Sequence, residues 1–331
     1  AWLGGSRLGR RGRALGAPSR GVAAAPLGSP PPRGGVAALL APAWPVGPAV
    51  ASPTAPLKVG DATVETASDG TLSSSLAFML PDVPRAEVDA VFSAEGQPAE
   101  GSPIPTNASL VRVGGEVILI DAGSGNSFQP TAGKLGDTLE GRNVGREAVT
   151  RIVFTHAHPD HLWGAIDDFD DSERFPNARY VVPTAEWDFW TRDDVETLVP
   201  DWLKGFAVGS RRTLRRLEAK VERRKPGEAV APGLTYVATP GHTPGHASVL
   251  VEAGREQLLI GGDALSHAVA SFRRPAWAFG SDLDRDLAIR TRLALLDRLA
   301  NERVTLVGFH LPGSGVGRVE RSGDAYRFVP A

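Results

Sequence analysis

Three histidines and one aspartate fall within six residues in the segment HAHPDH, at positions 156–161. Neutral imidazole and carboxylate are common ligands of zinc and similar divalent ions. The segment follows the short apolar stretch 152–154, which we expect to end a strand. A loop at a strand end can point His156 and His158 to one side, and the following turn can direct Asp160 and His161 to a neighbouring position. One ion could not hold all four side chains together with its other ligands, so the spacing predicts two adjacent ions.

Two later loops and one single residue carry the same kinds of side chain. The segment TPGHTPGH, at positions 239–246, places His242 and His246 four residues apart in a loop that Gly and Pro constrain. A second apolar stretch ends in Gly-Gly before Asp263, a suitable place for a carboxylate that bridges two cations, and His310 follows another apolar stretch. Because the chain has only seven histidines in 331 residues, a chance cluster on the surface is the weaker interpretation.

These side chains need strands that end close together. Alternating and apolar stretches predict strands, and helical spacing of apolar residues predicts helices. We expect strands at 110–113, 116–121, 151–154, 178–182, 234–238, 247–251, 257–260 and 304–307, with a closing hairpin at 316–320 and 325–329. We expect helices at 184–190 with Thr184 as the N-cap, at 210–220 and at 283–300. Neither class dominates, which favours sheets covered by helices in one layered α/β domain.

The motifs resemble those of the metallo-β-lactamase superfamily, in the expected order, over roughly residues 57–331. The resemblance rests on HAHPDH, on GHT at 241–243, on GD at 262–263 and on the single His310. It implies a four-layered αββα sandwich with a pair of metal ions at one edge. It assigns His156, His158 and His242 to the first ion, Asp160, His161 and His310 to the second, and Asp263 to both. Asp121, in the segment IDAG, matches the family's acid that orients the site without binding metal.

The resemblance implies a dinuclear hydrolase in which a hydroxide shared by the two ions attacks an ester-type bond. Aryl esters, lactones and phosphotriesters are the expected substrates. Asp160 or Asp263 is the candidate to accept a proton as the intermediate collapses. We expect Zn²⁺, although Mn, Fe and Co also suit His and Asp ligands. The chain has no Cys, and Asp263 stands where the zinc β-lactamases carry a Cys ligand, which favours the binuclear hydrolase branch.

Weaker motifs resemble the methyl parathion hydrolase subgroup, whose members include lactone- and ester-active enzymes. They include the tail GDAYRFVP at 323–330, FPNA at 175–178 and DFW at 188–190. This resemblance implies an aromatic pocket of Phe128, Trp190 and Phe206 for the leaving group, with packing in the core as the alternative for each ring. His246 is expected behind His242, and His267 either faces the substrate cleft or lies exposed.

Other functions use similar ligands. A lactonase specialised for acyl-homoserine-lactone-like substrates is one alternative, and a thioesterase of the glyoxalase II type is another. Iron-dependent oxidoreductases occur in the same superfamily, and a metal-binding protein without catalysis is a further class. Metal analysis with a substrate panel distinguishes them.

The first 51 residues differ in composition from the rest, which we expect to be one hydrolase domain over 52–331. Residues 1–57 contain six Arg and no acid, and Ala49-Val50-Ala51 matches a signal-peptidase site. Arg10-Arg11 fits a twin-arginine signal, although prolines interrupt the apolar run that follows. We expect a signal-like or disordered extension and a periplasmic or secreted protein, with a cytoplasmic protein as the alternative.

Charge and hydropathy limit the partners. Without residues 1–51 the chain would keep 30 basic and 38 acidic residues, a net charge of about −8. A negative field repels phosphate backbones, so we expect no nucleic-acid partner. No apolar run approaches the roughly 18 residues of a membrane span, so we expect no membrane partner. The expected partner is a small-molecule substrate, and a homodimer is left open.

Overall fold

The computed structural model describes residues 55–331, whose strands form two seven-stranded sheets. The predicted N-terminal extension, residues 1–51, lies outside the described residues. The first sheet, in spatial order, is β1 (Leu57–Val59), β2 (Ala62–Leu72), β3 (Ile104–Val113), β4 (Glu116–Ile120), β5 (Arg151–Val153), β6 (Arg179–Pro183) and β7 (Val221–Arg224). The second sheet, in spatial order, is β14 (Ala325–Pro330), β13 (Val316–Ser322), β12 (Thr305–Val307), β11 (Glu256–Ile260), β10 (Ala247–Ala253), β9 (Leu234–Ala238) and β8 (Ala229–Ala231).

Both sheets contain parallel strand pairs next to the loops that carry the predicted ligands. In the first sheet, β4, β5, β6 and β7 run parallel to one another. In the second sheet, β11 and β12 are parallel, with Leu258 opposite Thr305 and Ile260 opposite Val307. Because parallel neighbours finish at the same edge of a sheet, the loops after β4 and β5 start side by side, as do those after β11 and β12.

Alternation along the strands sends apolar side chains to both faces of each sheet. In β4, Ile118 and Ile120 pack between the sheets with Val249 and Ile260 of the second sheet. Leu119, between them in sequence, packs on the opposite face among residues of the covering helices. This period of two is the geometry of a strand buried on both faces, which explains the unbroken apolar run in the sequence.

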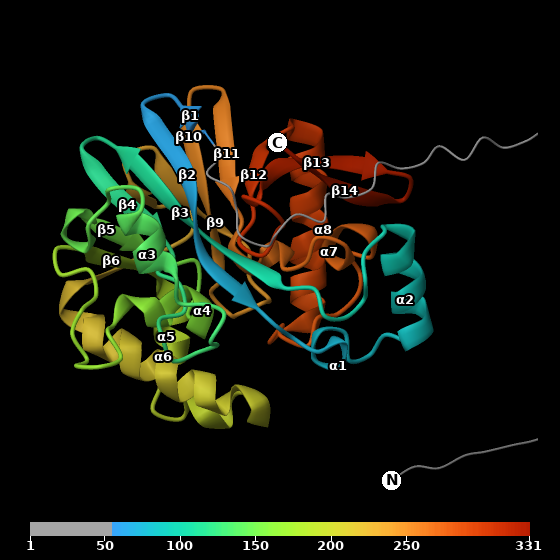
Figure 1. Ribbon diagram of the computed structural model, residues 1–331, viewed down its shortest axis with the longest axis horizontal. Helices are drawn as coiled ribbons and strands as arrows, with labels where there is room; N and C mark the ends of the chain where they lie inside the picture. Colours follow the sequence, from blue (N-terminus) through green and yellow to red (C-terminus); the bar gives the residue numbers. More distant parts are fainter. Residues whose placement is uncertain (1–54) are drawn as a thin grey trace, which may run out of the picture. The chain divides into compact units, whose positions relative to one another are not determined.

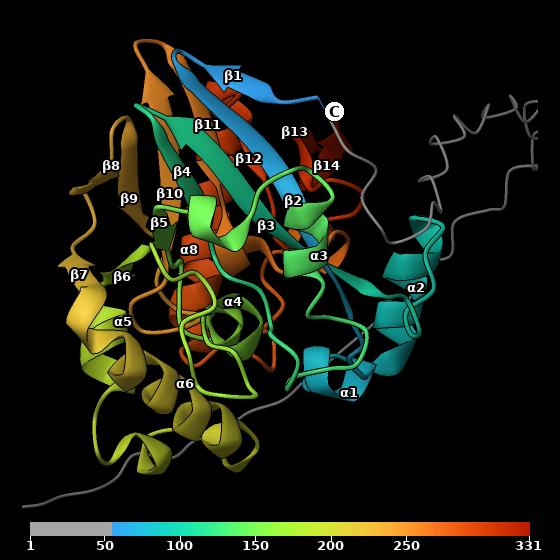
Figure 2. The ribbon, with the colours of Figure 1, turned by 60° about the vertical axis from the view of Figure 1, so that its left-hand side comes forward.

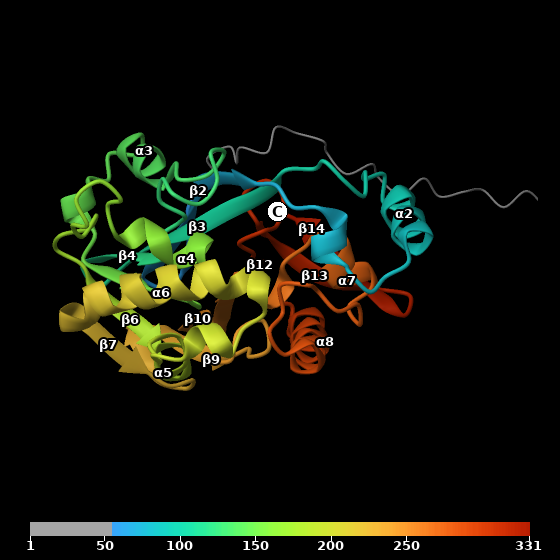
Figure 3. The same cartoon turned by 90° about the horizontal axis from the view of Figure 1, so that it is seen from below.

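Helices cover the outer face of each sheet. On the first sheet lie α3 (Leu135–Glu140), α4 (Pro159–Leu162), α5 (Thr184–Trp190) and α6 (Lys204–Leu217). On the second sheet lie α7 (Ala270–Arg273) and α8 (Arg285–Glu302), whose Leu295, Leu296 and Leu299 pack against strand residues. Figures 1 and 3 show α6 and α8 on opposite sides of the strands. The order helix, sheet, sheet, helix confirms the predicted αββα sandwich.

Two further helices follow β2 and form a small apolar cluster of their own. They are α1 (Leu76–Met79) and α2 (Arg85–Ala94), which pack with Val269 and Phe279. Figure 2 shows them beyond the ends of β2 and β3. Within the described part of the chain, none of the helices combines the length and the apolar character needed to cross a membrane.

The helix predicted at 184–190 is confirmed, but its predicted N-cap and the predicted start of the next helix are wrong. Thr184 is the first residue of α5 and not its cap, because Pro183 occupies the cap position and makes no side-chain cap bond. The helix predicted from position 210 begins at Lys204. Gly is a poor helix former, yet α6 contains Gly205 and Gly209. Gly209 is needed inside α6 because a Cβ there would meet the indole of Trp163 at 2.2 Å.

Candidate metal centre

The predicted ligands lie in loops that follow strands of both sheets. The segment 156–161 comes after β5, His242 after β9, Asp263 after β11 and His310 after β12. Asp121 follows β4, the parallel neighbour of β5. Strand pairing within each sheet and the packing of the two sheets against each other therefore bring segments more than 150 residues apart to one edge of the sandwich.

Three histidines form the first group, as the sequence predicted. Nitrogens of His156, His158 and His242 all lie within 4.8 Å of one another, and all three side chains are buried. His158 Nδ1 and His242 Nε2 are 2.9 Å apart. Two imidazole nitrogens face each other at this distance either through one shared proton or around a cation.

The second group contains Asp160, His161 and His310, also within 4.8 Å and buried. His310 Nε2 lies 3.3 Å from Asp160 Oδ2, and His161 Nε2 lies 3.4 Å from the same oxygen. Asp263 contacts both groups, with Oδ1 at 3.2 Å from His161 Nε2 and Oδ2 at 3.3 Å from His242 Nε2. The structure therefore brings all seven predicted ligands together and places Asp263 between the groups.

Three donor atoms at the centre have no hydrogen-bond partner within the described residues. They are the Nε2 atoms of His156 and His161 and Oδ1 of Asp263, all buried. Leaving buried polar atoms unpaired costs about 1–3 kcal/mol each, so native proteins seldom collect three of them in one place. Five imidazoles and two carboxylates with free lone pairs fit a pair of divalent ions.

Hydrogen bonds behind the imidazoles set which ring nitrogen is free. His161 Nδ1 lies 2.7 Å from Asp121 Oδ2, and His310 Nδ1 lies 2.8 Å from the carbonyl oxygen of Pro105. Both partners are acceptors, so in the neutral ring Nδ1 carries the proton and the lone pair of Nε2 is the one available to a metal. Thr155 donates its backbone N–H to Asp121 at 2.7 Å and fixes that carboxylate. The structure thus places Asp121 behind the ligands, as predicted.

Burial and charge act in opposite directions on these histidines. Burial, together with the neighbouring histidines, holds the pKa of His156 and His158 well below 6.5. Burial also opposes protonation of His161 and His310, but Asp160 and Asp263 outweigh it. They raise the pKa of His310 to about 10 and that of His161 well above 6.5. Without metal, the second group holds positive charge where a cation would bind.

His246 lies behind Asp263. Its Nε2 accepts the backbone N–H of Asp263 at 2.9 Å, so its Nδ1 carries the proton and donates to Thr239 Oγ1 at 2.8 Å. Burial lowers the pKa of His246 to about 3, which keeps this ring neutral. His246 was expected behind His242, but its hydrogen bond goes to the backbone of Asp263, so it supports the site from behind that aspartate.

Glu186 on α5, which the sequence analysis missed, joins the two loops that carry the first group. Its Oε2 accepts the backbone N–H of Ala157 at 3.0 Å, and its Oε1 accepts that of Gly245 at 2.8 Å. Trp190 Nε1 donates to the same carboxylate at 2.6 Å. Burial raises the pKa of Glu186, and these donors oppose the rise. The only sequence signal was an acid four residues before a Trp on one helix face.

Trp190 was predicted to line the substrate pocket, and the structure corrects this. Its side chain is 0% exposed, and its ring packs 5.7 Å from the ring of His158, behind the first group. A fully buried ring cannot touch a substrate. Trp190 instead holds Glu186 and packs against a predicted ligand.

The other two predicted pocket rings belong to a partly exposed aromatic wall beside the centre. Phe206 lies 6.3 Å from His158 and 5.4 Å from Phe128, ring centre to ring centre. The full wall consists of Phe78, Phe128, Trp163, Trp202 and Phe206, each in edge-to-face contact with another member. The sequence analysis missed Phe78, Trp163 and Trp202. Trp163 directly follows HAHPDHL, but Phe78 and Trp202 reach the wall only through tertiary packing.

His267 is not exposed. It is half-buried, and its Nδ1 accepts the backbone N–H of Val269 at 3.1 Å and of Ala270 at 3.3 Å. Burial lowers its pKa to about 4, which keeps Nδ1 free to accept. His267 therefore fixes the start of α7.

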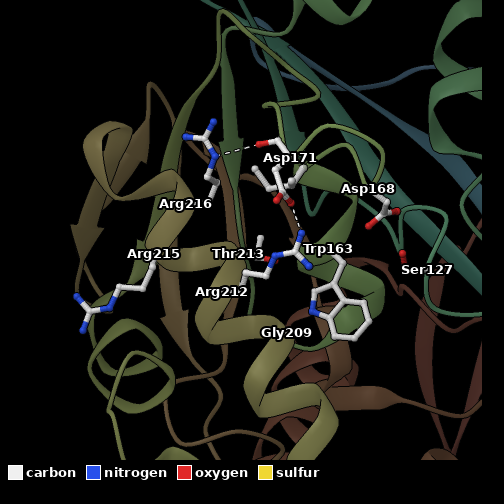
Figure 4. A pocket seen from close by; sticks show the side chains of 10 residues that line it. Ser127, Trp163, Asp168, Asp171, Gly209, Arg212, Thr213, Arg215 and Arg216 are labelled. Carbon is white, nitrogen blue, oxygen red and sulfur yellow. Dashed lines mark hydrogen bonds and ion pairs between the residues drawn. The ribbon is translucent and has the colours of Figure 1, made fainter.

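A separate cavity of about 450 Å³ lies between α6 and the loop around Asp171. Trp163 and Gly209 line it, and none of the seven predicted ligands does. Figure 4 shows Arg212 and Arg216 pointing toward Asp171, with Trp163 beside Gly209. The ion pair of Arg212 with Asp171 and the hydrogen bond from Arg216 to the Asp171 carbonyl bind α6 to that loop, and the cavity is not part of the centre.

Comparison with known proteins places this arrangement in a family. The family model described as "Metallo-beta-lactamase superfamily" matches residues 101–310. The uncharacterized protein YobT of Bacillus subtilis is 29% identical over 203 residues, which cover 59% of this chain and 79% of YobT. The probable metallo-hydrolase Rv2300c of Mycobacterium tuberculosis is 25% identical over 238 residues, 65% of this chain and 74% of the relative.

Solved structures share the fold. AidC, a dizinc quorum-quenching lactonase solved with a product, gives a TM-score of 0.79 at 24% identity and covers 86% of this chain and 99% of its own. The hydrolase AbOPH gives a TM-score of 0.77 at 27% identity and covers 83% of this chain and 96% of its own. The chain belongs to the metallo-β-lactamase superfamily and is a metal-dependent hydrolase.

Proposed function

We propose that this protein is a dinuclear hydrolase of ester-type bonds. The observation that carries the proposal is the convergence of five imidazoles and two carboxylates in two groups, with Asp263 contacting both. His156, His158 and His242 hold the first ion, and Asp160, His161 and His310 hold the second. Zn²⁺ is the proposed metal, supported by this donor set and by the dizinc description of AidC.

Two bound divalent ions would lower the pKa of a shared water toward neutrality and polarise the oxygen of the scissile bond. The protein side chains supply positioning and proton transfer. Asp121 and the Pro105 carbonyl hold the Nδ1 protons of His161 and His310, so Nε2 is the ring atom that each would offer to a metal. Asp160 and Asp263 are the carboxylates at the centre, and one of them would accept the proton of the attacking hydroxide and pass it to the leaving oxygen as the bond breaks. No Ser or Cys nucleophile is required.

The aromatic wall supports an apolar substrate. Phe206 is half-buried and lies beside His158, so an aryl or acyl group next to the reacting bond would contact its ring. We propose aryl esters, lactones and phosphotriesters as substrates, within the methyl parathion hydrolase-like subgroup. The lactonase described for AidC makes an acyl-homoserine lactone the first lactone to test.

Metal analysis of the purified protein, with turnover of an aryl ester, a lactone and a phosphotriester, tests the proposal. We expect two equivalents of zinc and hydrolysis of at least one substrate. Asp263→Ala removes the carboxylate between the groups, so we expect loss of one or both ions and nearly all activity. Asp286→Ala, an exposed carboxylate on α8, is the matched control and keeps both.

Two results would contradict the proposal. One is an Asp263→Ala variant with full metal content and full turnover. The other is a protein that binds iron and consumes oxygen, which would assign it to the oxidoreductases of the superfamily.

A further inference from the structure

A buried carboxylate, Asp282, lies directly behind His242. Asp282 Oδ1 is 3.0 Å from His242 Nδ1, and the two side chains are 1% and 3% exposed. The other oxygen, Oδ2, accepts a hydrogen bond from the Arg292 guanidinium at 2.9 Å. One oxygen of the Asp282 carboxylate therefore contacts the imidazole of His242, and the other pairs with the buried guanidinium of Arg292.

Arg292 occupies the buried face of α8, where an unpaired charge would be costly. Its side chain is 2% exposed. It also donates to the carbonyl oxygens of Pro275 at 2.9 Å and Trp277 at 2.8 Å, and its guanidinium lies 4.4 Å above the ring of Phe279. Arg292 thus fixes the segment that carries Asp282 as well as the carboxylate itself.

The backbone binds the same segment to the loop of His242. The N–H of Leu283 donates to the carbonyl of His242 at 3.1 Å, and the N–H of Asp284 donates to that of Gly241 at 2.9 Å. A shift of Asp282 would therefore move the ligand loop, and a shift of the ligand loop would break the contact with Asp282.

We infer that Asp282, held by Arg292, is the residue that positions His242 for the first ion. Each half of the centre then has one imidazole backed by a carboxylate, His161 with Asp121 and His242 with Asp282. Because Asp282 can only accept, the proton of neutral His242 stays on Nδ1 and the lone pair of Nε2 faces His158 and Asp263. Such partners orient the ring and raise its basicity toward the metal. The inference rests on the proposed dinuclear function.

Single substitutions of Asp282 leave Arg292 buried without a partner and could unfold the protein. Two double variants avoid this, Asp282→Asn/Arg292→Met and Asp282→Ala/Arg292→Met. Both lack the ion pair and the buried charge, and they differ in whether His242 Nδ1 keeps an acceptor. Arg321→Met is the control. It breaks the exposed ion pair between Arg321 on β13 and Asp297, which lies on the same helix, α8, as Arg292.

The readout is zinc affinity of each site, measured by titration against a chromophoric chelator, with the visible absorption of the Co²⁺-loaded protein. We expect the Ala double variant to bind the first ion roughly 10–100-fold more weakly than the control, with a changed Co²⁺ spectrum. The Asn double variant should recover at least half of this loss on a logarithmic scale. The second ion should stay within about threefold of the control in both variants.

Equal first-site affinity in the two double variants would overturn the inference, whether both are weakened or neither is. A wild-type protein that binds one ion would contradict the dinuclear function instead. In that case the same pair of variants still decides whether Asp282 supports the ion held by His242.

Discussion

Glu186→Gln is the substitution that most directly tests how the first ligand group is held. The carboxylate joins the loop of His156 and His158 to the loop of His242 through the backbone N–H groups of Ala157 and Gly245. A glutamine has nearly the same shape but has only one accepting oxygen. Whichever way the amide is turned, its NH₂ group faces at least one buried N–H.

The hydrogen bonds give the size of the effect. An unpaired buried N–H costs about 1–3 kcal/mol, and the remaining two donors, including Trp190 Nε1, each lose about 1 kcal/mol when their acceptor loses its charge. We expect the free energy of unfolding to fall by about 3–5 kcal/mol. Folded domains are typically stable by about 5–15 kcal/mol, so the variant should remain folded and measurable.

Urea unfolding of the metal-free protein, followed by Trp fluorescence, measures this change. Glu196→Gln is the matched control, because Glu196 is partly exposed and pairs with Arg211 at 2.8 Å on the surface. We expect a change of at most about 1 kcal/mol there. The reasoning is refuted if Glu186→Gln changes the stability no more than the control and leaves zinc affinity unchanged.

Four further predictions follow from the geometry. Burial opposes protonation of His310, but the charge of Asp263 outweighs burial and raises the pKa of His310 to about 10. Zinc must displace this proton, so zinc affinity should increase as the pH rises toward 10, and binding near pH 7.5 should release a proton. Calorimetry in buffers of different ionisation enthalpy detects that proton, and identical heats would contradict it. The same raised pKa stabilises the metal-free protein below pH 6.5, and this contribution is lost as the pH rises through about 10. Gly209→Ala should destabilise the protein by about 1–3 kcal/mol, because the new Cβ would lie 2.2 Å from the indole of Trp163. Gly205→Ala places its Cβ in open space and should stabilise the protein by up to about 1 kcal/mol. Thermal unfolding compares the two variants. Phe206→Ala should raise the KM for aryl esters about tenfold, the equivalent of about 1.4 kcal/mol, and leave metal content unchanged; an equal rise for a small alkyl ester would contradict a role in aryl binding.

The sequence alone predicted the candidate ligands and the layered fold. HAHPDH supplies four donors within six residues directly after a strand, so local geometry suffices to point them in two directions. The unbroken apolar runs before Asp121 and Asp263 predict buried strands that end where those acids stand. Such patterns can be recognised from the sequence because the residues that form them are close together along the chain.

Tertiary structure decided what stands behind and beside the ligands. Asp282 is 40 residues from His242, and Glu186 is 59 residues from Gly245, so no local spacing could relate them. Trp190 and Phe206 are both aromatic residues on helices of the same layer, yet the first is fully buried and the second is partly exposed beside His158. Residue type predicts that a ring prefers burial, but the direction in which each helix faces the sheet decides whether a substrate can reach it.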